Sequence, residues 1–205
     1  MAVRWGYIDR HPFLGQTRLE HAKPRSRYVT DAEVQACFDV QPLRHRGSVK
    51  MCQAFIRFKL LVGLRKSDIL NLRIEQLKDD GIHLTTGKTG KPIVFTWTDA
   101  LRVAVEEAKS VRPVHISPFL FCNRRGECYV DANGRTGAFD LVWKNFMDRV
   151  KAESGIEHFT EHDLRAKVAS DAESLDRAQE VLTHSSPEIT AKVYRRAATK
   201  VKPIR

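Results

Sequence analysis

The stretch from Thr160 to Tyr194 limits the possible fold of this chain more than any other, because it contains two successive helix starts. Thr160 and Asp163 form the pattern of a capping box, in which each side chain accepts a hydrogen bond from the other residue's backbone amide. Ser186, followed by a proline and a glutamate, predicts the start of a second helix. The C-terminal part of the chain should therefore be helical, with two helix N-termini in one place.

Two histidines, an arginine and a tyrosine fall within this stretch. His162 and Arg165 are three residues apart, on one face of the first predicted helix. His184 lies in the short loop before the second helix, and Tyr194 lies roughly two turns into it. Helix N-termini surrounded by cationic side chains are typical of an anion site, and tyrosine is the residue type that can act as a nucleophile there.

The charge of the chain favours a polyanionic partner. The sequence has 35 Lys and Arg against 25 Asp and Glu, which gives a formal net charge of +10. Nucleic acid is the first partner that such an excess suggests, and a basic protein that binds no polyanion is the alternative. No apolar run reaches membrane-spanning length, and Met1 does not begin a signal peptide, so we expect a soluble cytoplasmic protein.

The cysteines give no sign of a metal site. None of the four has CxxC spacing, and although Cys122 and Cys128 could lie near each other, a structural zinc site is not expected. Reduced thiols are the simplest interpretation. We therefore expect neither a metal nor another cofactor.

Capping signals and helical apolar spacing predict a mainly α-helical domain with one small sheet. Helices are expected at residues 30–38, 48–62, 98–110, 136–150, 175–182 and 186–198, around His162, and in a short piece capped by Ser67. Three short strands separated by turns are predicted at residues 72–77, 81–86 and 91–96. The expected class is α+β with a three-stranded antiparallel sheet.

Two basic residues upstream extend the candidate site. Arg65 follows a Gly-Leu pair directly after a predicted helix, and Asp68 comes three residues later. Lys88 lies at the tip of the predicted hairpin, with Lys91 as the competing lysine. Alone, such an arginine is more often part of a surface salt bridge, and such a lysine is usually only solvated surface.

The ordered set of motifs is more specific than any one of them. His-Asp-Leu-Arg, then Leu-Thr-His-Ser-Ser, then a tyrosine ten residues after that histidine resembles the C-terminal signature of the tyrosine recombinases, the phage integrase family. The Gly-Leu-Arg box and the hairpin lysine resemble the same family. The resemblance implies that family's catalytic-domain fold and six catalytic positions: Arg65, Lys88, His162, Arg165, His184 and Tyr194.

The resemblance also implies what each position does. The arginines offer planar forks to the phosphate oxygens, and His184 adds a hydrogen bond. Tyr194 attacks phosphorus and forms a 3′-phosphotyrosine, so strands are cut and rejoined without a metal. With a pKa near 10, tyrosine needs a base, for which His162 is the best candidate. Lys88 can protonate the departing 5′-oxygen.

The resemblance covers roughly residues 27–198. Residues 1–26 then form an N-terminal arm, either the remnant of a junction with a core-binding domain or an ordinary arm, and residues 199–205 form a basic tail. The implied partners are double-stranded DNA, further copies of the chain that assemble as a tetramer on DNA from monomers in solution, and directionality or accessory DNA-bending proteins. The implied source is a phage or other mobile element in a bacterial cell, rather than a chromosomal resolvase.

Two departures from the family's pattern are visible, at Thr183 where glycine is usual and at Ala166 and Lys167 after the arginine. Neither removes a reacting group. Two other functions remain open: a type IB topoisomerase, which shares the nucleophile and the arginines, and a noncatalytic DNA-binding module of the same fold. The hairpin and the Leu-Thr-His-Ser-Ser pattern favour the recombinase over the topoisomerase, and the intact set of six residues argues against a noncatalytic module.

Overall fold

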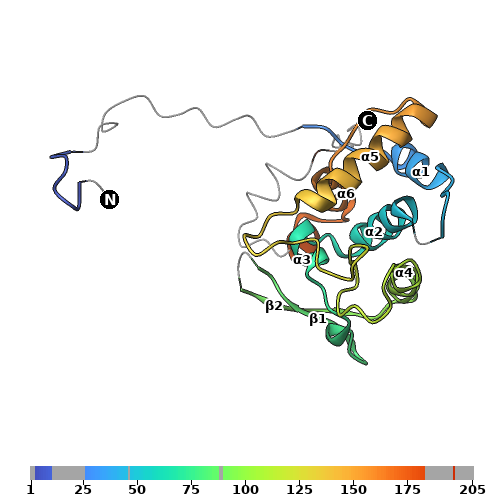
Figure 1. Cartoon of the computed structure of the whole chain (residues 1–205), viewed down its shortest axis with the longest axis horizontal. Coiled ribbons are helices and arrows are strands. Elements are labelled where there is room, and N and C mark those ends of the chain that lie inside the picture. Colours follow the sequence, from blue (N-terminus) through green and yellow to red (C-terminus); the bar gives the residue numbers. More distant parts are fainter. Residues whose placement is uncertain (1–2, 11–25, 46, 88–89, 183–195, 197–205) are drawn as a thin grey trace, which may run out of the picture.

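The structure is a computed structural model, and it describes residues 3–10, 26–45, 47–87, 90–182 and 196. The elements of this part, shown in Figure 1, are α1 (Asp31–Asp39), α2 (Ser48–Val62), α3 (Lys66–Leu70), the 3₁₀ helix η1 (Ile74–Gln76), β1 (Gly81–Thr85), β2 (Pro92–Thr96), α4 (Asp99–Ser110), α5 (Gly137–Ser154), α6 (Glu161–Asp171) and α7 (Leu175–Leu182). The expected class, mainly helical with a small antiparallel sheet, is confirmed.

Helix α2 is the centre of the domain. Ten of its 15 residues are buried, so it is covered on nearly every side rather than along one stripe. It packs against α4 on one side and against α5 and α6 on the other (Figure 1). Three of the other helices are therefore placed directly against this one.

Contacts between aromatic rings join α2 to α5 and to the segment that precedes α5. The ring of Phe55 lies 4.7 Å from that of Phe139, 5.5 Å from Phe121 and 6.1 Å from Trp143, measured between centroids. Tilted and edge-on pairs at these separations are favourable beyond the area that they bury. The amphipathic stripe predicted on residues 136–150 is thus confirmed as core.

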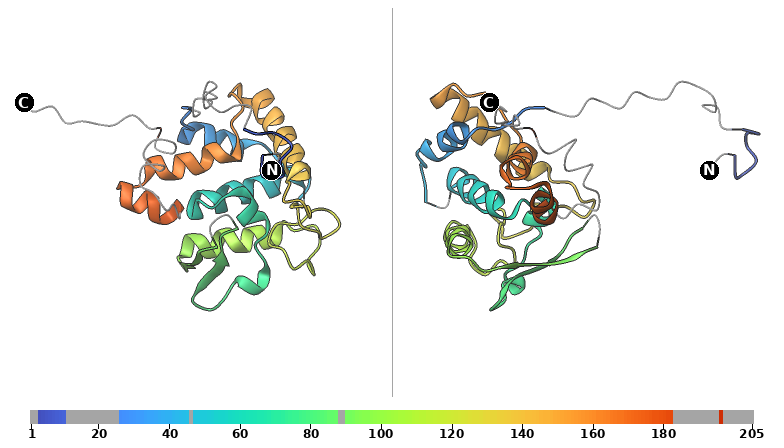
Figure 2. Two further views of the ribbon diagram at one scale, coloured as in Figure 1. Left: turned by 90° about the vertical axis from the view of Figure 1, so that its left-hand side faces the viewer. Right: turned by 180° about the vertical axis from the view of Figure 1, so that it is seen from behind.

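The sheet has two strands in the described part of the chain, and the prediction of a third was wrong. β1 and β2 pair antiparallel, with Gly81 opposite Thr96, at the end of the domain opposite α1 (Figure 2). Residues 74–76 of the expected first strand form η1 instead, because the Gln76 side chain accepts a hydrogen bond from the Arg73 amide (2.8 Å) and closes a local turn. Only isolated bridges remain on either side of this turn.

Three predicted helix caps are confirmed. Thr30, Thr98 and Thr160 each accept a hydrogen bond from the backbone amide three residues later, at 3.2–3.3 Å. At Thr160 the Asp163 carboxylate also accepts from the threonine's own amide (2.8 Å), which completes the capping box. The start of α6, and with it the position of its first turn, is therefore fixed by local sequence.

Two other predicted caps differ. Ser67 lies inside α3, because Arg65 is extended and its carbonyl already accepts the first helical hydrogen bond, from the Ile69 amide (3.1 Å). Thr136 is the N-cap residue of α5, but its hydroxyl donates to the Asp140 carboxylate (3.0 Å) and caps no amide.

The segment that leads into α1 is fastened to α6. The ammonium of Lys167, whose side chain is only 4% exposed, lies 2.6 Å from an oxygen of Asp31, 2.8 Å from Asp171 and 3.2 Å from the Tyr28 hydroxyl. The Tyr28 hydroxyl in turn donates to Asp171, and Arg27 donates to backbone carbonyls of the loop before α6. Residues 27–31 thus contact the helix that carries two of the predicted site residues.

The remaining expectations concern membranes and thiols. Within the described residues, no helix has both the length and the apolar character needed to cross a bilayer. All four cysteines are free, and Cys122 and Cys128 face each other in an isolated antiparallel bridge, as their spacing suggested.

Candidate active site

Arg165 is buried at the meeting point of two helix ends. Its side chain is fully inaccessible, and its guanidinium donates to the carbonyls of Gly63 and of Leu182, the second at 2.6 Å. Gly63 is the C-cap of α2 and Leu182 is the last residue of α7. Carbonyls at helix C-termini lack helical partners and carry the negative end of the dipole, so a cation is well placed there.

Gly63 makes this close approach feasible. Its φ of 59° is left-handed, and a β-carbon at this position would lie 3.1 Å from methyl carbons of both Val168 and Val181. A side chain would therefore need both a strained backbone and a shift of α6 and α7. Glycine allows α2, α6 and α7 to converge on one turn.

Arg65 lies two residues beyond Gly63, at the start of α3, and is partly buried. Its Nη1 is buried without a hydrogen-bond partner among the described residues. A buried donor that is left unpaired is costly and needs an explanation. An oxyanion supplied by a ligand would satisfy it.

Asp68 joins this turn to the hairpin. One carboxylate oxygen accepts a hydrogen bond from the Gly87 amide (3.0 Å), and the other is buried without a partner in the described part of the chain. The turn itself is closed by Thr86, whose amide donates to the Lys91 carbonyl (3.0 Å). The residue before the predicted Lys88 is therefore held at α3, although Lys88 itself lies outside the described residues.

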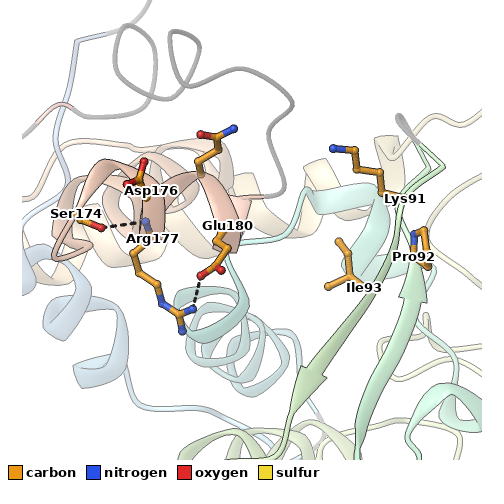
Figure 3. A pocket seen from close by; sticks show the side chains of 8 residues that line it. Lys91, Pro92, Ile93, Ser174, Asp176, Arg177 and Glu180 are labelled. Carbon is orange, nitrogen blue, oxygen red and sulfur yellow. Dashed lines mark hydrogen bonds and ion pairs between the residues drawn. The ribbon is translucent and has the colours of Figure 1, made fainter.

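Lys91, the competing lysine, faces a different region. It lines a cleft of about 660 Å³ between the start of β2 and α7, shown in Figure 3. On the opposite wall Arg177 and Glu180 form an ion pair of 2.7 Å. Two charged residues of the wall opposite Lys91 are thus paired with each other.

His162 lies in the first turn of α6, with part of its side chain exposed. Desolvation lowers its pKa, and the positive charges of Lys59, Arg165 and Arg196 act in the same direction, whereas Glu161 opposes them. The imidazole is therefore neutral at pH 7 and able to accept a proton.

A line of alternating charges connects the start of α6 to α2 and α5. Glu161 lies 3.2 Å from Lys59 and 3.2 Å from Lys66, and Lys66 lies 2.6 Å from Asp140. Lys59 is fully buried in α2. The sequence prediction missed Lys59, and the available signal was a charged residue at helical spacing from the core residues Phe55 and Ile56.

Arg196 is held against α6 and is largely buried. Its side chain is 5% exposed and lies 2.6 Å from Asp163, which is fully buried. It also donates to the Arg27 carbonyl (3.0 Å), and its amide donates to Ser170 (2.6 Å). The chain two residues after Tyr194 is therefore fixed to α6.

Of the six predicted residues, the structure brings together Arg65, His162 and Arg165. Lys88, His184 and Tyr194 lie outside the described residues, as does the helix predicted at residues 186–198. Within the described part, no group of three His, Cys, Asp or Glu side chains could hold a metal ion.

Comparisons with known proteins give one family and one fold. Residues 29–200 match the phage integrase family. A lambda integrase dimer bound to a COC' core site is 20% identical with a TM-score of 0.71, over 100% of this chain and 58% of that one. A lambda integrase tetramer bound to a Holliday junction is 20% identical with a TM-score of 0.68, over 98% of this chain and 57% of that one. The XerA recombinase is 17% identical with a TM-score of 0.64, over 96% of this chain and 67% of that one.

The two lambda integrase chains are thus considerably longer than this one, which spans somewhat more than half of their length. No curated protein matches the chain by sequence.

Proposed function

Because the chain belongs to the phage integrase family, we propose that it is the catalytic domain of a tyrosine site-specific recombinase, which cleaves and rejoins DNA strands through a 3′-phosphotyrosine. The observation that carries this proposal is the turn after α2. There Arg65 keeps a buried donor with no partner in the described chain, and Gly63 beside it accepts from Arg165. Two guanidinium groups held by one turn suit the oxygens of a phosphodiester.

The arginines supply fixed positive charge where negative charge develops on phosphorus. Preorganised donors of this kind are commonly the largest contribution to catalysis. Arg165 is already immobilised by two carbonyls, and Arg65 is the N-cap residue of the helix that follows the same turn. Because side chains provide this charge, adduct formation should persist in EDTA.

Proton transfers complete the proposed reaction. Tyr194 attacks phosphorus, and His162, which is neutral at pH 7, accepts the phenolic proton. Lys88 protonates the 5′-oxygen that leaves, and His184 donates a hydrogen bond to the phosphate. The hydrogen bond between Asp68 and Gly87 supports the role of Lys88, because it holds the hairpin beside Arg65. Attack of another strand's 5′-hydroxyl on the phosphotyrosine would complete strand exchange.

The proposed catalytic domain covers residues 27–198, with residues 1–26 as an arm and 199–205 as a basic tail. The packing of residues 27–31 on α6 supports its N-terminal limit. We expect double-stranded DNA as substrate and four protomers in the active assembly, in the cytoplasm of a bacterial cell. Similarity to a dimer on a core site and to a tetramer on a Holliday junction supports this expectation. Accessory DNA-bending or directionality proteins are further proposed partners.

A suicide DNA substrate, nicked beside the scissile phosphate, tests the function. The wild-type protein should form a covalent adduct that resists denaturation, and Tyr194→Phe should form none while it still binds DNA. The sequence of the target must first be found by selecting bound fragments. Adduct formation by Tyr194→Phe would overturn the assignment of the nucleophile.

The same assay separates the two alternatives. Binding without any adduct in the wild type would identify a noncatalytic module. Adduct formation and relaxation of supercoiled DNA, with no exchange between two duplexes, would identify an enzyme that acts like a topoisomerase.

A further inference from the structure

Lys59 is a lysine in the most deeply buried helix of the domain. Its side chain is fully inaccessible, and its ammonium lies 5.6 Å from the centroid of the Phe55 ring. Two polar contacts hold it: a hydrogen bond to the Leu64 carbonyl (3.1 Å) and an ion pair with Glu161 (3.2 Å). Both contacts lie next to residues of the candidate active site.

These contacts span the two segments that carry the arginines. Leu64 directly precedes Arg65, and Glu161 is the first residue of the helix that carries Arg165. The Lys59 carbonyl also accepts a hydrogen bond from the Gly63 amide (2.8 Å). One residue therefore holds the turn after α2 by its backbone and by its side chain, and ties that turn to the start of α6.

The position is unfavourable for a charge. Burial lowers the pKa of Lys59 to about 8, and the nearby cations Arg165 and Lys66 act in the same direction, while Glu161 opposes them. Glu161 keeps a second partner, Lys66. Removing the Lys59 ammonium would thus leave Glu161 paired with Lys66 and avoid the desolvation of a buried cation, but it would take the side-chain donor from the buried Leu64 carbonyl.

We propose that Lys59 is a positioning residue, which sets the separation of Arg65 and Arg165 by bracing the Leu64 carbonyl against Glu161. The inference rests on the proposed function, because the arginines must act together on one phosphate. A group placed about 1 Å away from its working position can lower a rate about a hundredfold, so a brace of this kind affects the reaction more than the fold. Natural proteins commonly accept such a cost in stability at their functional sites.

The test compares Lys59→Met with Arg57→Met. Arg57 lies on the same helix with its side chain 47% exposed and paired with Glu107, so its replacement removes the same charge away from the site. Both variants are measured with the suicide substrate for the rate of adduct formation at saturating protein, for DNA affinity, and for thermal unfolding. Lys59→Met should slow adduct formation by at least about tenfold with unchanged DNA affinity, and should lower the midpoint of unfolding by no more than about 6 °C, as expected for one lost buried hydrogen bond. Arg57→Met should keep the wild-type rate.

A double-mutant cycle supplies the second measurement. If Lys59 acts through Glu161, then Lys59→Met and Glu161→Gln together should slow the reaction by less than the product of the two single effects. An unchanged rate in Lys59→Met overturns the proposal, as does a double variant that slows the reaction by the full product of the two single effects. Adduct formation by the wild-type protein is measured first. If the wild type forms no adduct, the proposed function itself is overturned.

Discussion

Arg65 and Arg165 are predicted to serve the same phosphate, yet the structure treats them differently. Arg165 is fully buried and donates from both terminal nitrogens to main-chain carbonyls, whereas Arg65 is partly exposed and its Nη1 has no partner among the described residues. A paired guanidinium stabilises the fold around it. A buried guanidinium nitrogen without an acceptor lowers the stability of the fold, and a bound anion that accepts its hydrogen bond would restore that stability. A shared role in the reaction therefore does not imply a shared role in stability.

The largest effect should come from Arg165→Ala. This change removes the donor from the carbonyls of Gly63 and Leu182 at once, and hydrogen bonds to charged groups contribute about 1.5 to 3 kcal/mol each. We expect the free energy of unfolding, measured with urea, to fall by about 3 kcal/mol or more. A loss below about 0.5 kcal/mol would show that the carbonyls are not held by this side chain.

Arg65→Ala should separate reactivity from stability. Its free energy of unfolding should stay within about 1 kcal/mol of the wild type, because a donor without a partner contributes no protein hydrogen bond. Adduct formation should slow by at least about a hundredfold, as expected when one preorganised donor is lost. If Arg65→Ala and Arg165→Ala lowered the free energy of unfolding equally, the two arginines would not differ in their contribution to stability.

Asp68→Ala tests whether the hairpin must stay beside Arg65. Loss of the hydrogen bond to Gly87 should cost about 1 kcal/mol of stability. The rate of adduct formation should fall about tenfold, because the hairpin is no longer held near the phosphate. Asp80→Ala, at the other end of the hairpin where Asp80 contacts His83, is the matched control and should keep the wild-type rate.

The smallest expected effect is a change in the pKa of His162. Its pKa is lowered by burial and by cations that include Lys59 and Arg165, so Lys59→Met should move this pKa upward when followed by NMR titration. Below the ordinary histidine value of about 6.5, the unfolded chain binds more protons than the folded chain, so stability falls as the pH falls. The variant should lose less stability in that range. A pKa that moves down or does not move would show that Lys59 does not act on His162.

The sequence predicted some locally determined structure correctly and some wrongly. The capping box at Thr160 and the left-handed C-cap at Gly63 lie where their side-chain chemistry requires. The strand expected at residues 72–77 was wrong because alternating apolar residues do not reveal that Gln76 closes a turn on Arg73.

The order of motifs along the chain predicted which residues belong to the candidate site. It did not predict how deeply these residues are buried or which groups they contact. Nothing local to Arg165 indicates that it is buried against the ends of two helices distant in sequence. Lys59 was overlooked because a lysine among apolar helix positions usually extends its head to solvent. The burial of Arg196 was not predicted, since its partner Asp163 lies 33 residues away.

The attachment of residues 27–31 to α6 has a mechanical consequence. Tyr28 and Asp31 are both clamped by Lys167, two residues beyond Arg165 on the same helix. A force applied to the chain at Arg27 would therefore act directly on the helix that carries His162 and Arg165.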